Sequence, residues 1–134
     1  MNPSPGAEQR RAAEWECARL IHLYAQLNDA GRWAELAELY APDGSMTRPT
    51  APDTPVIGRA AIRAAFEARP PRTTRHICAN VVIEVDGPTS ARGSSAMLLF
   101  TAAEAPPLVG GFEDRFVRTG EGWRFAERRG TLTF

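Results

Sequence analysis

Apolar residues recur with helical periodicity in the first part of the chain. Between about Glu8 and Asn28 they cover roughly half of a helical wheel, which predicts one long amphipathic helix. Gly31 ends this helix, and residues 1–8, which are rich in proline and glycine, predict a flexible N-terminal tail. The apolar arc consists of Cys17, Ala18, Leu20, Ile21, Tyr24, Ala25 and Leu27.

Two shorter helices are predicted after the first. Apolar residues continue at helical spacing from Trp33 to Tyr40, and the turn signal Pro42-Asp43-Gly44 ends that helix. The prolines within residues 45–57 predict a loop with room for a short edge strand. A third helix opens at Gly58 and stops before Pro70-Pro71, since proline cannot continue a helix.

The second half of the chain has the composition and alternation of β-strands. Turn-forming residues separate the runs, as in antiparallel hairpins. Helices followed by strands predict an α+β fold, with a curved antiparallel sheet packed on the helices in one domain over residues 9–134. The four predicted strands are His76 to Val85, Ala91 to Ala102, Val109 to Arg118 and Gly122 to Thr133.

The first long strand has one polar and one apolar face. With a period of two, His76, Cys78 and Asn80 share one face. The opposite face carries Val81, Ile83 and Val85, which suit either the core or a dimer interface. His76 then lies either at a solvated strand end or at the mouth of a pocket.

Two charged positions in the last strands leave two interpretations each. Asp114 alternates with Phe112 and Phe116 on one face, so it is either exposed at a twist or directed into a cavity. Arg128 and Arg129 are adjacent in a strand, so one of them must face inward. That arginine either pairs with an acid or binds an anionic group of a ligand.

Composition excludes several classes of protein. Lys plus Arg and Asp plus Glu are balanced at 16 each, so no basic patch predicts binding to nucleic acid or to a membrane surface. No apolar run approaches the roughly 18 residues of a membrane span, and the N-terminus lacks the apolar segment of a signal peptide. We therefore expect a cytoplasmic protein with Cys17 and Cys78 as buried, reduced thiols. All basic residues are arginines, which is typical of a GC-rich bacterial genome.

Few residues are candidates for chemistry. The chain has no phosphate-binding, dinucleotide-binding or metal-binding motif, so we expect no cofactor and no metal. His22 falls on the polar side of the first helix and is expected at the surface. Asp29 lies at the edge of the apolar arc, where it either caps the next helix or faces a pocket.

Several short motifs follow one another in a specific order and spacing: Tyr24, Asp29 and Trp33, then Gly58-Arg59, Thr74-Arg75-His76 and Asn80, then Phe112 with Asp114, and finally Gly122-Trp123-Arg124-Phe125. Over about residues 10–130 this arrangement resembles the SnoaL-like branch of the nuclear transport factor 2-like superfamily. That family implies a cone-shaped α+β barrel, in which three helices pack on a strongly curved, mostly antiparallel sheet. Known members include scytalone dehydratase-like and bile-acid dehydratase-like enzymes, ketosteroid isomerases and polyketide cyclases.

The resemblance implies roles for individual residues. Asp29 and His76 match the acid and histidine of a catalytic dyad in the dehydratases, and Tyr24 matches a tyrosine that polarises the substrate carbonyl. The chain departs from the family pattern at Phe112, which lacks a hydroxyl, and in the wholly apolar stretch 96–100. We expect ligand contacts from Asn80, Asp114, Phe112, Met97, Trp33 and Phe66.

The expected function is a lyase or isomerase, such as a dehydratase or cyclase, acting on an apolar or aromatic carbonyl compound. His76 would serve as general base, Asp29 would orient its ring, and Tyr24 would donate to the enolate oxygen. One alternative is a binding module without catalysis. Another is an isomerase or epoxide hydrolase that uses Asp114 as a second buried acid. The family also implies a homodimer formed through the outer face of the sheet.

Overall fold

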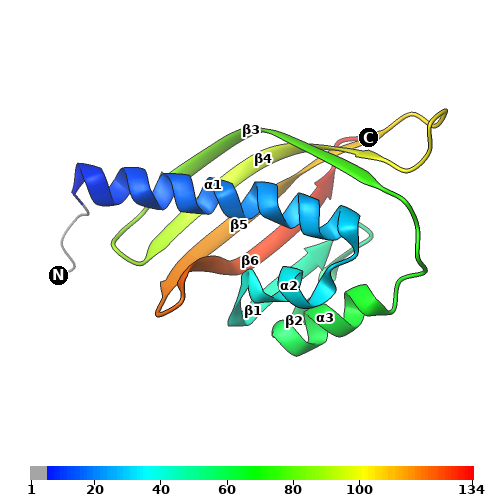
Figure 1. Cartoon of the computed structure of the whole chain (residues 1–134). Helices are drawn as coiled ribbons and strands as arrows, with labels where there is room; N and C mark the ends of the chain where they lie inside the picture. The colour runs from blue at the N-terminus through cyan, green and yellow to red at the C-terminus, as the bar shows by residue number, and fades with distance from the viewer. Residues whose placement is uncertain (1–5) are drawn as a thin grey trace.

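The computed structural model describes residues 6–134, in which three helices lie on one side of a six-stranded curved sheet (Figure 1). The strand order is β2-β1-β6-β5-β4-β3, and only the β1–β6 pair is parallel. The predicted α+β cone is thus confirmed, with a sheet that stays open. The elements are α1 (Ala7–Ala30), α2 (Trp33–Glu38), β1 (Tyr40–Arg48), β2 (Ala51–Ile57), α3 (Arg59–Glu67), β3 (Arg75–Val85), β4 (Ser90–Phe100), β5 (Leu108–Thr119) and β6 (Gly122–Leu132).

Helix α1 crosses the concave face of the sheet and buries its apolar arc there (Figure 1). It begins at Ala7, so the last two positions of the predicted tail are helical, while residues 1–5 lie outside the described part. Gly31 ends the helix at φ 69°, a left-handed conformation that costs glycine little. None of the helices in residues 6–134 is long and apolar enough to cross a bilayer.

The predicted end of the second helix is wrong. Tyr40 starts β1, and Pro42-Asp43-Gly44 lies within that strand. The pairing with β6 steps from Tyr40↔Phe125 to Ser45↔Glu127, so the turn residues bulge out between two ladder positions. Residues 51–57, expected to be mostly loop, form the edge strand β2, where their prolines are tolerated.

The four long strands fall within two residues of their predicted ends, but the face assignment in β3 changes at Asn80. The pairing with β4 steps from Ala79↔Ala96 to Val82↔Ser94, which leaves one extra residue on β3. Asn80 has φ 54° and is exposed. The bulge reverses the alternation, so His76 and Cys78 face inward on the same side as Val81, Ile83 and Val85.

The core fills the space between α1 and the concave side of the sheet. Tyr40, Phe116 and Phe125 are fully buried there, and Phe66 of α3 stacks on Trp33 with ring centroids 5.1 Å apart. Val81, Ile83 and Val85 pack against this core, so they belong to the core and not to a dimer interface. Both cysteines are free thiols, Cys17 buried and Cys78 half-buried.

Candidate active site

Asp29 joins the end of α1 to the start of β3. Its Oδ1 accepts hydrogen bonds from His76 Nδ1 at 2.6 Å and from Thr74 Oγ1 at 2.9 Å, and its Oδ2 accepts from the His76 backbone N–H at 2.9 Å. Arg32 stands at the N-cap of α2, which has no side-chain cap, so the capping interpretation of Asp29 is wrong. Three donors instead hold the carboxylate in one orientation.

The contact with Asp29 determines how the His76 ring is protonated. A carboxylate can only accept, so Nδ1 carries the hydrogen of this bond and Nε2 of the neutral ring keeps a free lone pair. The His76 side chain is 10% exposed and lines both an inner cavity and a groove between α1 and β3, whereas Asp29 lines that groove but not the inner cavity. His76 is therefore the member of the pair that can touch a ligand, and Asp29 positions it.

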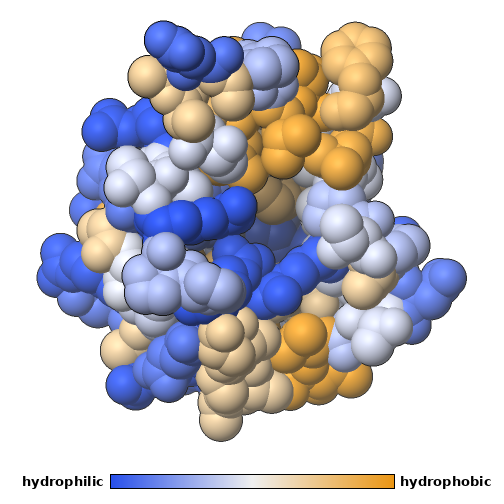
Figure 2. Space-filling view, turned by 90° about the vertical axis from the view of Figure 1, so that its right-hand side faces the viewer, coloured by the Kyte–Doolittle hydropathy of each residue, from blue (hydrophilic) through white to orange (hydrophobic). Residues whose placement is uncertain are grey.

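The inner cavity has a volume of about 230 Å³ and opens at the end of the cone where α3 and the β4–β5 loop lie. Figure 2 faces this end and shows a hollow with hydrophobic surface above it and hydrophilic residues across and below it. Five predicted site residues line the cavity: Tyr24, His76, Phe66, Met97 and Phe112.

The other predicted contacts fall elsewhere. Asn80 is exposed within the bulge of β3, so it does not share the inward face of His76 as expected. Trp33 stacks behind Phe66, and Asp114 is buried next to Arg128, so neither is among the described residues that line the inner cavity. No cluster of three metal-binding side chains occurs in the described part of the chain.

Tyr24 and Tyr40 form a buried hydrogen-bonded pair beside the cavity. Their hydroxyls are 3.0 Å apart, and Tyr24 is also 3.8 Å from Met46 Sδ. Burial raises the pKa of both phenols above the ordinary value of 10, so both stay protonated at neutral pH. When Tyr40 donates to Tyr24, the Tyr24 hydrogen is free for Met46 or for a ligand in the cavity.

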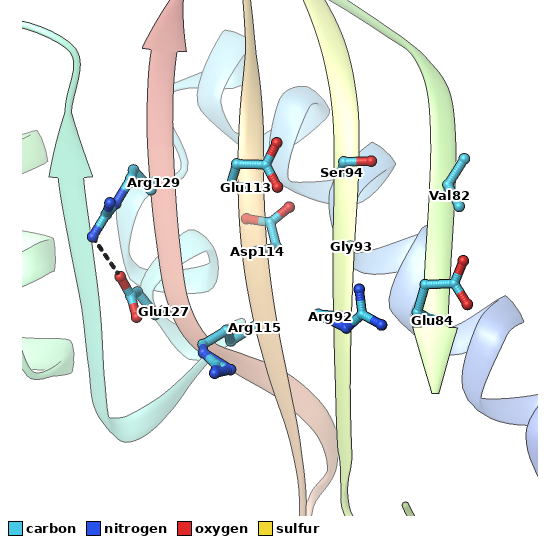
Figure 3. Close-up of a pocket in the computed structure, with 10 residues that line it drawn as sticks. All are labelled: Val82, Glu84, Arg92, Gly93, Ser94, Glu113, Asp114, Arg115, Glu127 and Arg129. Carbon is cyan, nitrogen blue, oxygen red and sulfur yellow. Dashed lines mark hydrogen bonds and ion pairs between the residues drawn. The ribbon is translucent and has the colours of Figure 1, made fainter. Parts of the chain in front are cut away.

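Arg128 is the inward-facing member of the two adjacent arginines. Its Nε donates to Asp114 Oδ1 at 3.0 Å, and its guanidinium lies 3.6 Å from the Phe112 ring centroid and 4.3 Å from that of Tyr24. Nη1 and Nη2 have no partner among the described residues, although Arg128 is only 1% exposed and lines the cavity. Arg129 points to the other face of the sheet (Figure 3).

A larger hollow of about 580 Å³ lies on that other face, away from the helices (Figure 3). Its wall alternates Glu and Arg side chains, with Glu127 and Arg129 paired at 3.3 Å. It is open, and the described residues that line it include no histidine, tyrosine or cysteine. The inner cavity is therefore the better candidate for chemistry.

The sequence model of the SnoaL-like domain matches residues 9–129. The chain belongs to the SnoaL-like domain family. This confirms the resemblance seen in the sequence motifs. No curated protein matches this SnoaL-like domain.

Solved structures share its fold. A proposed scytalone dehydratase from Novosphingobium aromaticivorans matches with a TM-score of 0.83 and 24% identity, over 96% of this chain and 89% of that chain. A Catenulispora acidiphila protein in complex with S-DNPA matches with a TM-score of 0.74 and 25% identity, over 91% and 94%. ActVI-ORFA from Streptomyces coelicolor matches with a TM-score of 0.73 and 21% identity, over 88% and 95%.

The site of this SnoaL-like domain contains groups that sequence reasoning missed. Tyr40 was assigned to a helix, yet its hydroxyl supports Tyr24. Arg48, Arg69 and Arg72 also line the cavity. They come from β1 and from the segment between α3 and β3, and no periodic signal links these positions. The arrangement offers a free imidazole nitrogen, a protonated phenol and several guanidinium groups around one apolar space.

Proposed function

We propose that this SnoaL-like domain is a cofactor-independent lyase or isomerase, most specifically a dehydratase, that acts on a small ring-containing carbonyl compound. The observation that carries the proposal is the 2.6 Å bond from His76 to Asp29, which leaves Nε2 of a cavity-lining imidazole free to accept a proton. A cavity of about 230 Å³ is smaller than the roughly 300–1,000 Å³ of sites for drug-sized ligands. One or two fused rings would fit.

The proposed reaction transfers one proton in two steps. Nε2 of His76 removes a proton from the carbon next to the carbonyl, while Tyr24 donates a hydrogen bond to the developing enolate oxygen. Asp29 stabilises the imidazolium that forms. The enolate then expels a β-hydroxyl group, which takes the proton from His76 and leaves as water, so that a C=C bond replaces the C–H and C–O bonds.

Two comparisons support this choice of reaction and ligand. The Novosphingobium aromaticivorans structure is that of a proposed scytalone dehydratase, and the Catenulispora acidiphila protein binds S-DNPA. Both have the fold described here, so a small-molecule occupant and a dehydration are consistent with it. The cytoplasmic location and the homodimer remain predictions.

The test is turnover by matched variants on a panel of β-hydroxy ketones, followed by loss of the hydroxyl and by exchange of the α-proton in D₂O. We expect His76→Ala to lower the rate by about 10²–10⁴-fold, the usual contribution of a general base. Asp29→Asn should lower kcat and alter its pH profile, because the amide can present its N–H to Nδ1 and favour the wrong tautomer. His22→Ala is the control, since His22 is exposed on α1.

Retained activity in both the His76 and the Asp29 variant would rule out the dyad. A binding module without catalysis is the second candidate, because Met97 and Leu99 give the cavity an apolar wall where some dehydratases carry a polar group. Its signature is ligand binding by the wild type with no turnover and no α-proton exchange. Asp114 lies outside the cavity lining, so it gives no support to an isomerase or epoxide hydrolase built on that acid.

A further inference from the structure

Three guanidinium groups line the inner cavity without a carboxylate partner. They belong to Arg48 at the end of β1, and to Arg69 and Arg72 between α3 and β3. Within residues 6–134, none of the three has a carboxylate oxygen within 4.0 Å. In contrast, Arg59 and Arg63 on α3 both form ion pairs.

Two of these arginines, Arg48 and Arg69, pack against the same aromatic ring. The guanidinium of Arg69 lies 4.3 Å from the Phe66 ring centroid, and that of Arg48 lies 5.7 Å from it. Arg48 Nη2 makes a long 3.4 Å bond to Ala65 O, and its buried Nε has no partner among the described residues. Like charges are thus gathered where the protein supplies no anion.

Electrostatics and burial agree with this geometry. Burial and then the nearby Arg48 and Arg72 lower the pKa of Arg69 to about 10. Arg128 adds Nη1 and Nη2, which are buried and unpartnered at the cavity wall. No Asp or Glu is among the described residues that line the cavity. An anion from outside the chain would relieve this repulsion.

The opposite part of the lining is apolar. Leu99, Leu108 and Leu132 belong to it, and the last two are 45% and 46% exposed. The mouth in Figure 2 accordingly has hydrophobic surface on one side and hydrophilic residues on the other. A ligand that satisfies both sides has an apolar ring system and an anionic end.

We propose that the ligand of this cavity is a ring-containing carboxylic acid, whose carboxylate binds to Arg48, Arg69 and Arg72. Guanidinium groups bind carboxylates through paired, charge-assisted hydrogen bonds, which neither an apolar wall nor a histidine can replace. This specifies the substrate class of the proposed function. Binding of the carboxylate does not require the proton transfer, so the two can be tested separately.

The experiment measures binding by isothermal titration calorimetry for a panel of one-ring and two-ring arylacetates and their uncharged amides, for example 2-naphthylacetate and 2-naphthylacetamide. We expect at least one acid to bind the wild type about tenfold or more tightly than its amide. Arg69→Gln and Arg72→Gln should each reduce this preference several-fold. Arg63→Gln is the control, because Arg63 lies on exposed α3 surface and is paired with Glu67.

Several outcomes would overturn the proposal: equal affinity for acids and amides, no binding of any acid, or an equal loss of preference in the Arg63 control. Arg72 is exposed, so its variant is expected to fold even if the Arg69 variant does not. His76→Ala should keep the preference for acids over amides, because the carboxylate contacts come from the arginines. Turnover at the wild-type rate in His76→Ala would contradict the proposed function and leave the carboxylate site standing.

Discussion

Asp114 is a buried acid with only one of its two oxygens paired. Oδ1 accepts from Arg128, while Oδ2 has no partner among the described residues. Burial raises the pKa of Asp114 from its ordinary 3.8 to about 6, although Arg128 acts in the opposite direction. The folded protein therefore binds this proton more tightly than the unfolded chain does.

A pH-dependent stability follows from the raised pKa of Asp114. The stabilisation from this group is complete below about pH 4 and is lost as the pH rises through about 6. Asp114→Asn cannot titrate, so the free energies of unfolding of wild type and variant should shift relative to each other by up to about 3 kcal/mol between pH 4 and pH 7. Urea denaturation across this range measures the shift. Parallel pH curves would contradict it.

The surroundings of Asp29 and Arg128 are only partly predictable from the sequence. The helical wheel leaves Asp29 at the edge of an apolar arc, because its three donors come from Thr74 and His76, more than forty positions along the chain. Only the family resemblance links these positions. Arg128 was half predicted: the strand period requires one inward arginine, but not which of the two.

At the level of elements, periodicity predicts the helices and the long strands because each buries one continuous face. It fails at β1, where Pro42-Asp43-Gly44 has the composition of a turn and instead forms a bulge inside a strand. The local preference is still satisfied, since Pro42 and Asp43 are exposed. What keeps the strand going is its pairing with β6, which lies eighty residues away in the sequence and leaves no local signal.

The bulge at Asn80 yields a prediction about β3. At φ 54° a β-branched residue is strained, so Asn80→Val should lower the free energy of unfolding by about 1–2 kcal/mol. Asn80→Gly should be nearly neutral, because glycine adopts this conformation readily. Ala79→Val is the control, because Ala79 is an exposed neighbour on β3 with ordinary backbone geometry. Equal losses in Asn80→Val and Ala79→Val, measured by chemical denaturation, would show that strain at the bulge is unimportant.

At the scale of the molecule, the cavity exists because elements distant in sequence meet at the open end of the cone. Its lining draws on α1, α3, all strands except β2, and the segment that joins α3 to β3. Sequence patterns predict that a cone with a pocket forms. They do not predict that Arg48, Arg69 and Arg72 meet at one cavity, since that depends on how the ends of these elements pack.

We predict that the outer face of the sheet forms the interface of a homodimer. Glu and Arg side chains alternate across β3 to β6, so a copy related by two-fold symmetry can meet each charge with its opposite (Figure 3). Val82 lies among them and is 52% exposed. We expect a dimer in sedimentation velocity that weakens as salt is raised, because exposed charge pairs are screened. Val82→Asp should shift it to monomer, whereas Trp15→Asp on exposed α1 should not. Dissociation by the Trp15 variant alone would place the interface on the helical side instead.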